Sequence, residues 1–210
     1  MVVRGNHGTS GEREHPANAG ELRGRAANMV NSVMALPKVF TAVLTLLGQV
    51  FEEYHKLSGA RAILVGGAAV SIFTRGAYLS GDMDVLVAVN DAFIVALEKY
   101  GFEKDKEHLR GGYFHPSYPT YYVDLNSGAL FDGRADPRTV RVVILRPDSK
   151  LNLASVEDLI ADRLAQFSAN ERDPRPLKQA KLLKKLAGPL NMTYLAKRVA
   201  DEGGDLTVLG

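Results

Sequence analysis

The chain has 210 residues, of which 46% are hydrophobic, 24% charged and 8% aromatic. These proportions exclude a wholly disordered or fibrous protein, and the length suits one domain with a sizeable core, or one domain with an appendage. Cysteine is absent, which excludes disulfides, thiol catalysis and cysteine-based zinc sites, and the net charge of +2 does not by itself indicate nucleic-acid binding.

We expect a cytoplasmic protein without a membrane partner. The longest apolar stretch, residues 39–51, is shorter than the roughly 20 residues that a membrane-spanning helix needs. The N-terminus does not show the apolar core of a signal peptide. The absence of cysteine suits a reducing compartment.

Residues 1–33 predict a disordered tail, because glycines scattered among polar residues leave no apolar period. Apolar residues then recur at helical spacing over 37–57. A short apolar run at 61–65 ends in Gly66-Gly67 and predicts a strand followed by a turn. The next stretches predict a helix at 68–74, a strand at 83–89 and a helix at 91–100 that Gly101 ends.

Farther along the chain, strand-like segments lie at Tyr113, 120–125 and 139–145. From Ser155 onward the pattern is helical, over 155–168, 176–187 and 191–202. The chain is therefore predicted to divide into a tail at 1–33, an α/β core at 34–150 and a C-terminal helical region at 151–210.

Two carboxylates lie at the start of the strand predicted at 83–89. In Ser80-Gly81-Asp82-Met83-Asp84, the side chains of Asp82 and Asp84 project to one side, because positions i and i+2 of a strand share a face. Carboxylates this close repel each other, which raises one pKa unless a cation lies between them. Oxygen ligands without nearby sulfur or imidazole favour Mg²⁺. The sequence thus predicts magnesium ligands at Asp82 and Asp84.

A phosphate site is predicted beside these carboxylates. A strand, Gly66-Gly67 and a helix N-terminus direct backbone N–H groups at one place, and glycine lets the backbone approach a ligand closely. Phosphate-binding amides next to magnesium-binding carboxylates describe a nucleoside triphosphate site. Asp124, an isolated carboxylate in a strand-like segment, is the candidate third metal ligand. An edge-strand aspartate that faces water is the equal alternative for Asp124.

The Gly66-Gly67 turn, the Ser80-x-Asp82-x-Asp84 motif and Asp124 together resemble the nucleotidyltransferase superfamily that includes DNA polymerase β. Within it, the paired glycines and the helical C-terminal region look like AbiEii-type abortive-infection toxins and related bacterial nucleotidyltransferase-like proteins, and the layout is similar to that of aminoglycoside nucleotidyltransferases. The resemblance spans about residues 36 to 200. It implies a nucleotidyltransferase α/β (α+β) fold, in which a small mixed sheet with flanking helices precedes a C-terminal helical region.

The resemblance also implies site roles and a reaction. The catalytic metal ligands, for two Mg²⁺ ions or alternatively Mn²⁺, would be Asp82, Asp84 and Asp124. The triphosphate ligands would be Gly66, Gly67 and Ser80. The first hypothesis is therefore a nucleotidyltransferase that moves a nucleoside monophosphate from ATP, GTP, CTP or UTP to a hydroxyl of RNA or tRNA, a protein or a small molecule, with a toxin–antitoxin or phage-defence role. The second is a non-catalytic, antitoxin-like protein on the same fold that binds a nucleotide or a toxin or antitoxin partner.

A basic segment lies near the C-terminus. Residues 172–198 contain eight basic residues and one acidic residue, a net charge of +7. Such a segment either faces an anion, such as a triphosphate or an RNA backbone, or is a solvated helix face. Lys178, Lys181 and Lys185 share one face of the predicted helix, and Lys178 is the candidate nucleotide ligand.

Three further features have competing interpretations. Ser155 and Asp158 match a helix capping box, which favours a structural role. Arg163 could reach a phosphate, although an ion pair with Glu157 or Asp158 is the default. A tyrosine cluster precedes Asp124 and either stacks on a base or substrate ring or packs on the sheet, at positions 113, 118, 121 and 122.

Overall fold

The computed structural model describes residues 36–106 and 112–210, so the tail predicted at 1–33 lies outside the described residues. A seven-stranded mixed sheet has the order β3-β4-β5-β2-β1-β7-β6. Its strands are β1 (Ile63–Leu64), β2 (Asp82–Val87), β3 (Glu103–Lys104), β4 (Tyr113–His115), β5 (Tyr118–Ser127), β6 (Arg141–Arg146) and β7 (Ser149–Leu153). The predicted α/β class with a mixed sheet is confirmed.

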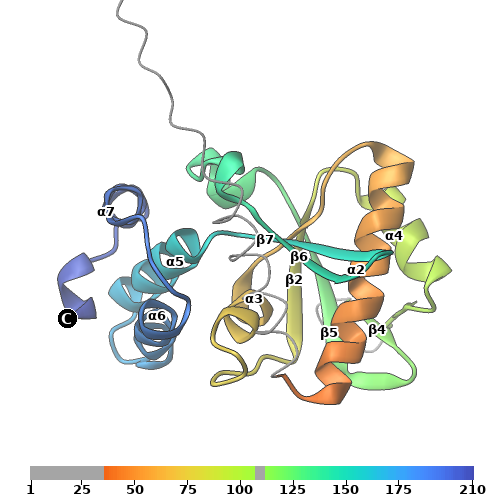
Figure 1. The fold of residues 1–210 in the computed structure, drawn as a ribbon, viewed down its shortest axis with the longest axis horizontal. Helices are drawn as coiled ribbons and strands as arrows, with labels where there is room; N and C mark the ends of the chain where they lie inside the picture. Colours follow the sequence, from red (N-terminus) through yellow and green to blue (C-terminus); the bar gives the residue numbers. More distant parts are fainter. Residues whose placement is uncertain (1–35, 107–111) are drawn as a thin grey trace, which may run out of the picture.

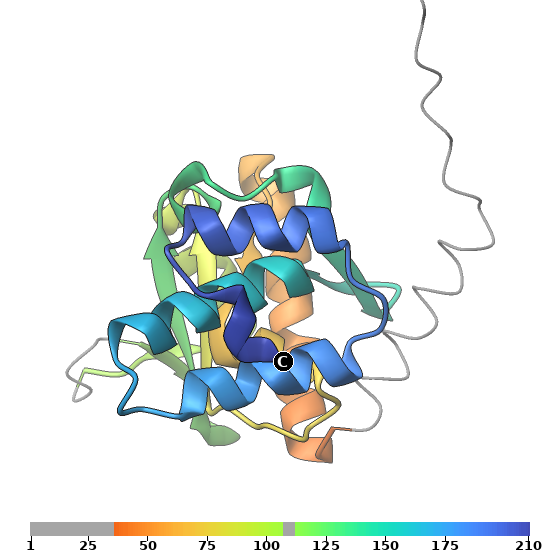
Figure 2. The same ribbon diagram turned by 90° about the vertical axis from the view of Figure 1, so that its left-hand side faces the viewer.

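Helices lie on both faces of this sheet. They are α2 (Lys38–Ser58), α3 (Gly66–Phe73), α4 (Asn90–Lys99), α5 (Val156–Ala169), α6 (Arg175–Leu186) and α7 (Met192–Asp201), with short 3-10 turns η1 (Leu130–Gly133), η2 (Pro137–Thr139) and η3 (Leu206–Leu209). Figure 1 shows α2 and α4 on one side of the sheet and α3 with the C-terminal helices on the other. Figure 2 shows α5, α6 and α7 stacked over that second face. None of the helices in the described ranges is long and apolar enough to cross a lipid bilayer.

The long helix α2 anchors the sheet. Its apolar stripe is buried because its members recur at helical spacing and face the strands, as Phe40, Val43, Leu47, Val50 and Phe51 do. Tyr54, also fully buried, packs edge-on against Phe93 of α4 with ring centroids 5.3 Å apart. Its hydroxyl oxygen accepts hydrogen bonds at 3.1 Å from the backbone N–H groups of Ala88 and Val89. This fastens the C-terminal end of β2 to α2.

Strand β7 was missed by the sequence analysis. It is a central strand, parallel to β1 through the pair Leu64 and Leu153 and antiparallel to the edge strand β6. Leu151 and Leu153 are buried, while Asn152 donates a hydrogen bond of 2.9 Å to the carbonyl oxygen of Ala62. Lysine and asparagine are depleted in strands, so composition hid a five-residue strand that alternate burial defines.

The C-terminal helices are joined by a buried polar network. Asp158 of α5 accepts hydrogen bonds from Arg198 Nε at 2.7 Å and from the Tyr194 hydroxyl at 2.9 Å, both on α7. Ser155 caps α5 by accepting from the Asp158 backbone N–H at 3.1 Å, which confirms the predicted structural role of this pair. Arg198 is completely buried, so this part of the predicted basic face is wrong: its charge is neutralised inside by Asp158 and Glu202.

Candidate active site

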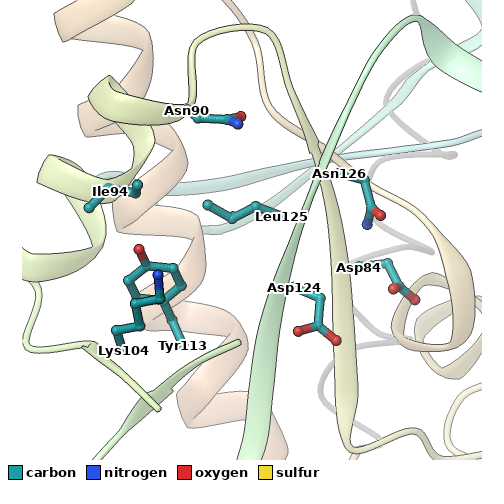
Figure 3. Close-up of a pocket in the computed structure, with 8 residues that line it drawn as sticks. All are labelled: Asp84, Asn90, Ile94, Lys104, Tyr113, Asp124, Leu125 and Asn126. Atoms are coloured by element: carbon teal, nitrogen blue, oxygen red, sulfur yellow. The ribbon is translucent and has the colours of Figure 1, made fainter. Parts of the chain in front are cut away.

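Asp84 and Asp124 lie side by side on neighbouring strands. Strands β2 and β5 are parallel and pair Asp84 with Asp124, which places both carboxylates on the sheet face that α3 and α5 cover. Figure 3 shows the two side chains together with Asn126. Asp82 pairs with Tyr122 at the start of β2 and is exposed, whereas Asp84 and Asp124 are half-buried.

The electrostatics of this pair follow from burial and like charge. Burial, and then the neighbouring Asp124, raise the pKa of Asp84 above its ordinary value of 3.8, with a smaller contribution from Asp82. The guanidinium of Arg163 on α5 and a hydrogen bond with Asn126 act in the opposite direction and lower the pKa of Asp84. Two ionised carboxylates here are therefore unfavourable without a compensating cation.

The N-terminus of α3 packs directly against Asp84. Gly66, its first residue, has φ of +62°, and a Cβ at this position would overlap the Asp84 carboxylate oxygen Oδ2. Glycine is required here both for its backbone conformation and for this close approach. No side chain caps α3, whose preceding residue is Val65, so first-turn amides and the positive end of the helix dipole are directed at this carboxylate edge.

Ser80 and Gly67, two of the predicted triphosphate ligands, lie close together. A Cβ on Gly67 would lie 2.6 Å from the Ser80 hydroxyl oxygen. Ser71 holds the two segments in place: its hydroxyl donates to the Gly67 carbonyl oxygen at 2.9 Å and accepts from the Ser80 backbone N–H at 3.1 Å. Ser71 was not predicted as a site residue, although its position i+4 from Gly67 in the predicted helix was visible in the sequence.

Two more residues at the carboxylates were missed. Asn126 follows Asp124 at i+2 and so shares its face of β5, the same spacing that pointed to Asp82 and Asp84. Gly112 lies so close to Asp124 that a Cβ would be 2.6 Å from its Oδ1. Its signal was its place just before the strand-like Tyr113, whose approach to Asp124 only the fold reveals.

The oxygen donors at the paired carboxylates determine which metal could bind there. Across residues 36–106 and 112–210, no group of three or more His, Asp and Glu side chains is arranged to hold a metal ion. Asp84 and Asp124, with the Asn126 amide oxygen, nevertheless form an all-oxygen set whose mutual repulsion a cation would relieve, and this chemistry suits Mg²⁺. Asp84 and Asp124 therefore fit the predicted role of metal ligands, whereas that role for the exposed Asp82 stays a prediction.

The predicted nucleotide ligand Lys178 and the cationic Arg163 differ in setting. Lys178 is exposed on α6, where its side-chain ammonium group makes no hydrogen bond or ion pair with a described residue, and its role stays a prediction. Arg163 is only 9% exposed and pairs with neither Glu157 nor Asp158. Instead Nη1 donates to Gln166 Oε1 at 2.7 Å and Nη2 lies 3.7 Å from Asp162 Oδ2. Its buried Nε has no hydrogen-bond partner among the described residues.

The tyrosine cluster divides between packing and the site. Tyr121 packs against Phe40 with ring centroids 5.4 Å apart, and Tyr122 lies against Phe114. Tyr118 contacts the ring of His115. Tyr113 alone among the four lines a pocket that also contains Asp84 and Asp124. Most of the cluster therefore has the predicted sheet-packing role.

Comparison with known proteins identifies the fold. No protein-family model matches the chain, and no curated protein matches it in sequence. The solution structure of the antibiotic-resistance factor ANT(2'')-Ia aligns with a TM-score of 0.51 at 12% identity, covering 77% of this chain and 91% of that chain. Its crystal structure in complex with adenylyl-2''-tobramycin aligns with a TM-score of 0.52 at 13% identity, covering 77% and 98%. The chain has a nucleotidyltransferase fold.

Proposed function

We propose that this protein is a magnesium-dependent nucleotidyltransferase that moves a nucleoside monophosphate from a nucleoside triphosphate to an acceptor hydroxyl. The observation that carries the proposal is the contact of two elements: the paired carboxylates of Asp84 and Asp124, and the glycine-started N-terminus of α3 against Asp84. The adenylyl-2''-tobramycin bound by ANT(2'')-Ia is a nucleotide joined to an acceptor oxygen, which supports the same reaction class here.

The metal ligands would be Asp84 and Asp124, with Asp82 completing the set when the site is loaded. Bound Mg²⁺ would neutralise phosphate charge and lower the pKa of an attacking hydroxyl. Burial, and then the like charge of Asp124, raise the pKa of Asp84, and a cation bound here would relieve both effects. Removal of either of the paired carboxylates would therefore remove the affinity for the metal and the triphosphate together.

The triphosphate would lie along α3. The first-turn amides that begin at Gly66 and Gly67, and the hydroxyl of Ser80, would donate to phosphate oxygens. Arg163 adds a buried cation near Asp84 whose Nε has no partner among the described residues, which suits a charge-assisted bond to phosphate. Lys178 would reach the outer phosphates from α6, which packs on α3.

The reaction itself is a single displacement at the α-phosphorus. The acceptor oxygen forms a bond to this phosphorus, the bond to the bridging oxygen of the β-phosphate breaks, and pyrophosphate leaves. Asp124 would accept the hydroxyl proton and release it to solvent. Positioning the two oxygens in line supplies most of the rate, as expected for phosphoryl transfer.

The test is transfer from α-labelled nucleoside triphosphates. The purified protein is incubated with Mg²⁺ and each of the four nucleotides in the presence of RNA, protein extract or small-molecule extract. The comparison is the double variant Asp84→Ala, Asp124→Ala, and the matched control is Asp148→Ala, an exposed carboxylate in the β6–β7 turn. We expect label transfer that the double variant abolishes and the control retains, and transfer that survives the double variant would contradict the assignment.

A non-catalytic nucleotide-binding protein is the second candidate. Its support is that Asp82 stands apart at the exposed start of β2, so the described carboxylates do not close into a three-residue metal cluster. A binding protein would show Mg²⁺-dependent nucleotide affinity without label transfer to any acceptor class. Binding with turnover would exclude it. A toxin–antitoxin role, which the AbiEii resemblance implies, would additionally require a partner protein that copurifies with the native chain.

A further inference from the structure

A pocket of about 380 Å³ opens beside the two aspartates, on the side away from α3. It lies next to the pair of Tyr113 on β4 and Val123 on β5. Figure 3 shows the two carboxylates at one end and α4 and β3 residues at the other. The lining residues are Asp84, Asn90, Ile94, Lys104, Tyr113, Asp124, Leu125 and Asn126.

The pocket and the triphosphate site occupy opposite sides of the carboxylates. Gly66 contacts Asp84 from α3, and neither Gly67 nor Ser80 lines the pocket. A donor nucleotide held along α3 would therefore leave this pocket free for the molecule that supplies the hydroxyl. The volume lies at the small end of the range for pockets that take a small molecule.

The chemistry of the far wall is specific. Ile94 and Leu125 provide apolar surface, and the buried Tyr113 provides an aromatic ring. Lys104 pairs across the strands with Tyr113 and so shares its face, and its side-chain ammonium group makes no hydrogen bond or ion pair with a described residue. Apart from Asp84 and Asp124, none of the lining residues that the structure describes carries a carboxylate. This wall suits an anion and disfavours a polycation.

We propose that this pocket binds the acceptor, and that the acceptor is a small hydroxylated molecule with an apolar body and one anionic group; this rests on the proposed function. The anion would pair with Lys104, the body would lie between Ile94, Leu125 and Tyr113, and the hydroxyl would face Asp124. Its oxygen bonds to the α-phosphorus, pyrophosphate leaves, and the proton passes to Asp124. The amide groups of Asn90 and Asn126 would orient the hydroxylated end.

An RNA acceptor fits this arrangement less well. The lysines that would track an RNA backbone lie on α6, which packs on α3 and α5. Figure 1 shows α6 on the opposite side of the sheet from α4. An RNA strand that placed its end in the pocket would leave along α4, away from Lys178 and Lys181. The pocket therefore favours a small acceptor.

The experiment measures binding before it measures transfer. Three probes share one phenol and differ in charge: 3-(4-hydroxyphenyl)propanoate, the neutral 4-(2-hydroxyethyl)phenol, and the cationic tyramine. Their affinities for the full chain are measured by ligand-observed NMR without nucleotide. We expect the anion to bind about tenfold more tightly than the amine, because only the anion can form a charge-assisted hydrogen bond with Lys104. Lys104→Glu should reverse this order, whereas Lys181→Glu on α6 should leave it unchanged.

Three results would overturn the proposal. The first is equal or tighter binding of tyramine to the unmodified chain. The second is an anion preference that Lys104→Glu does not alter. The third is label transfer to RNA that Lys104→Glu leaves intact. Because the binding measurements contain no nucleotide, loss of the proposed transfer activity and failure of the pocket assignment give separate signals.

Discussion

Replacing Gly66 by alanine should reduce the transfer activity far more than the stability of the protein. Gly59 provides a matched control in the same chain. Gly66 and Gly59 share a left-handed backbone, with φ of +62° and +69°. A Cβ on Gly59 would meet no atom within 4 Å, whereas a Cβ on Gly66 would overlap Asp84 Oδ2. Gly59→Ala therefore measures the backbone cost alone, and Gly66→Ala adds the displaced carboxylate.

The magnitudes follow from these contacts. A left-handed alanine costs about 1–2 kcal/mol, which the stiffer unfolded chain offsets by about 0.4–1 kcal/mol, so Gly59→Ala should destabilise by about 0.5–1 kcal/mol. Gly66→Ala should add about 0.5–1.5 kcal/mol for an off-rotamer Asp84 and about 1 kcal/mol for its weakened bond to Asn126, for a total of about 2–3.5 kcal/mol. Moving a metal-binding carboxylate by about 1 Å should reduce kcat/KM by roughly 10²-fold.

The assays are urea unfolding and label transfer from a nucleoside triphosphate, applied to both variants. Gly67→Ala adds a third comparison, because it brings a 2.6 Å contact with Ser80 without a positive φ. If Gly66→Ala retained kcat/KM within threefold of Gly59→Ala, the close packing of α3 on Asp84 would have no catalytic consequence. The assignment of this helix end to the triphosphate would then be refuted.

Three further predictions follow from buried charge. In the presence of a chelator, the Asp84→Asn variant should have a higher free energy of unfolding at pH 7 than the unmodified chain, because the folded state raises the pKa of Asp84 and ionisation of this carboxyl therefore destabilises the fold. The difference should vanish below pH 3.8, where Asp84 is protonated in both the folded and the unfolded state. A difference that persists there in unfolding curves would contradict the electrostatic cause. Arg198→Met should lower the free energy of unfolding by about 3–5 kcal/mol, because it leaves the buried Asp158 carboxylate without its cation. Lys197→Met on the exposed face should change the free energy of unfolding by no more than about 0.5 kcal/mol. Equal effects in urea unfolding would refute the role of the buried network. Arg163→Met should raise the Kd of a Mg²⁺-bound nucleoside triphosphate about tenfold or more in calorimetric titrations. An unchanged Kd would mean that Arg163 interacts only with its own helix, α5, and does not bind the nucleotide.

Local patterns predicted most of the helices and the motif residues well. The helix at 37–57 and the stop at Gly101 were accessible because apolar spacing and glycine chemistry act within a few residues. Gly66, Gly67, Ser80 and the aspartates were proposed as site residues from their spacing together with a family resemblance, and their roles stay predictions. The apolar spacing and the glycines act over a few residues, and the motif was read by its similarity to that of a known family.

Register and long-range approach could not be predicted. The pairing of Asp84 with Asp124 depends on how β2 and β5 align across 40 positions of chain, which no local pattern encodes. The burial of Arg198 depends on Asp158 and Glu202, so charge counting along the helix misjudged it. The pocket beside α4 gathers residues from α4, β3, β4, β5 and β2, a property of the assembled sheet.

The central position of β7 has a consequence for how the chain is made. Strand β1 is only two residues long and joins the β2–β5 pair to β7 and β6. Both paired aspartates are synthesised before β7, whose last residue, Leu153, pairs with Leu64. At about 5–20 residues per second, the ribosome adds the segment between Asp124 and Leu153 over roughly 1.5–6 s. Until β7 has left the ribosome, the edge of β1 that later pairs with β7 is open, and an open strand edge is a site for aggregation or for chaperone binding.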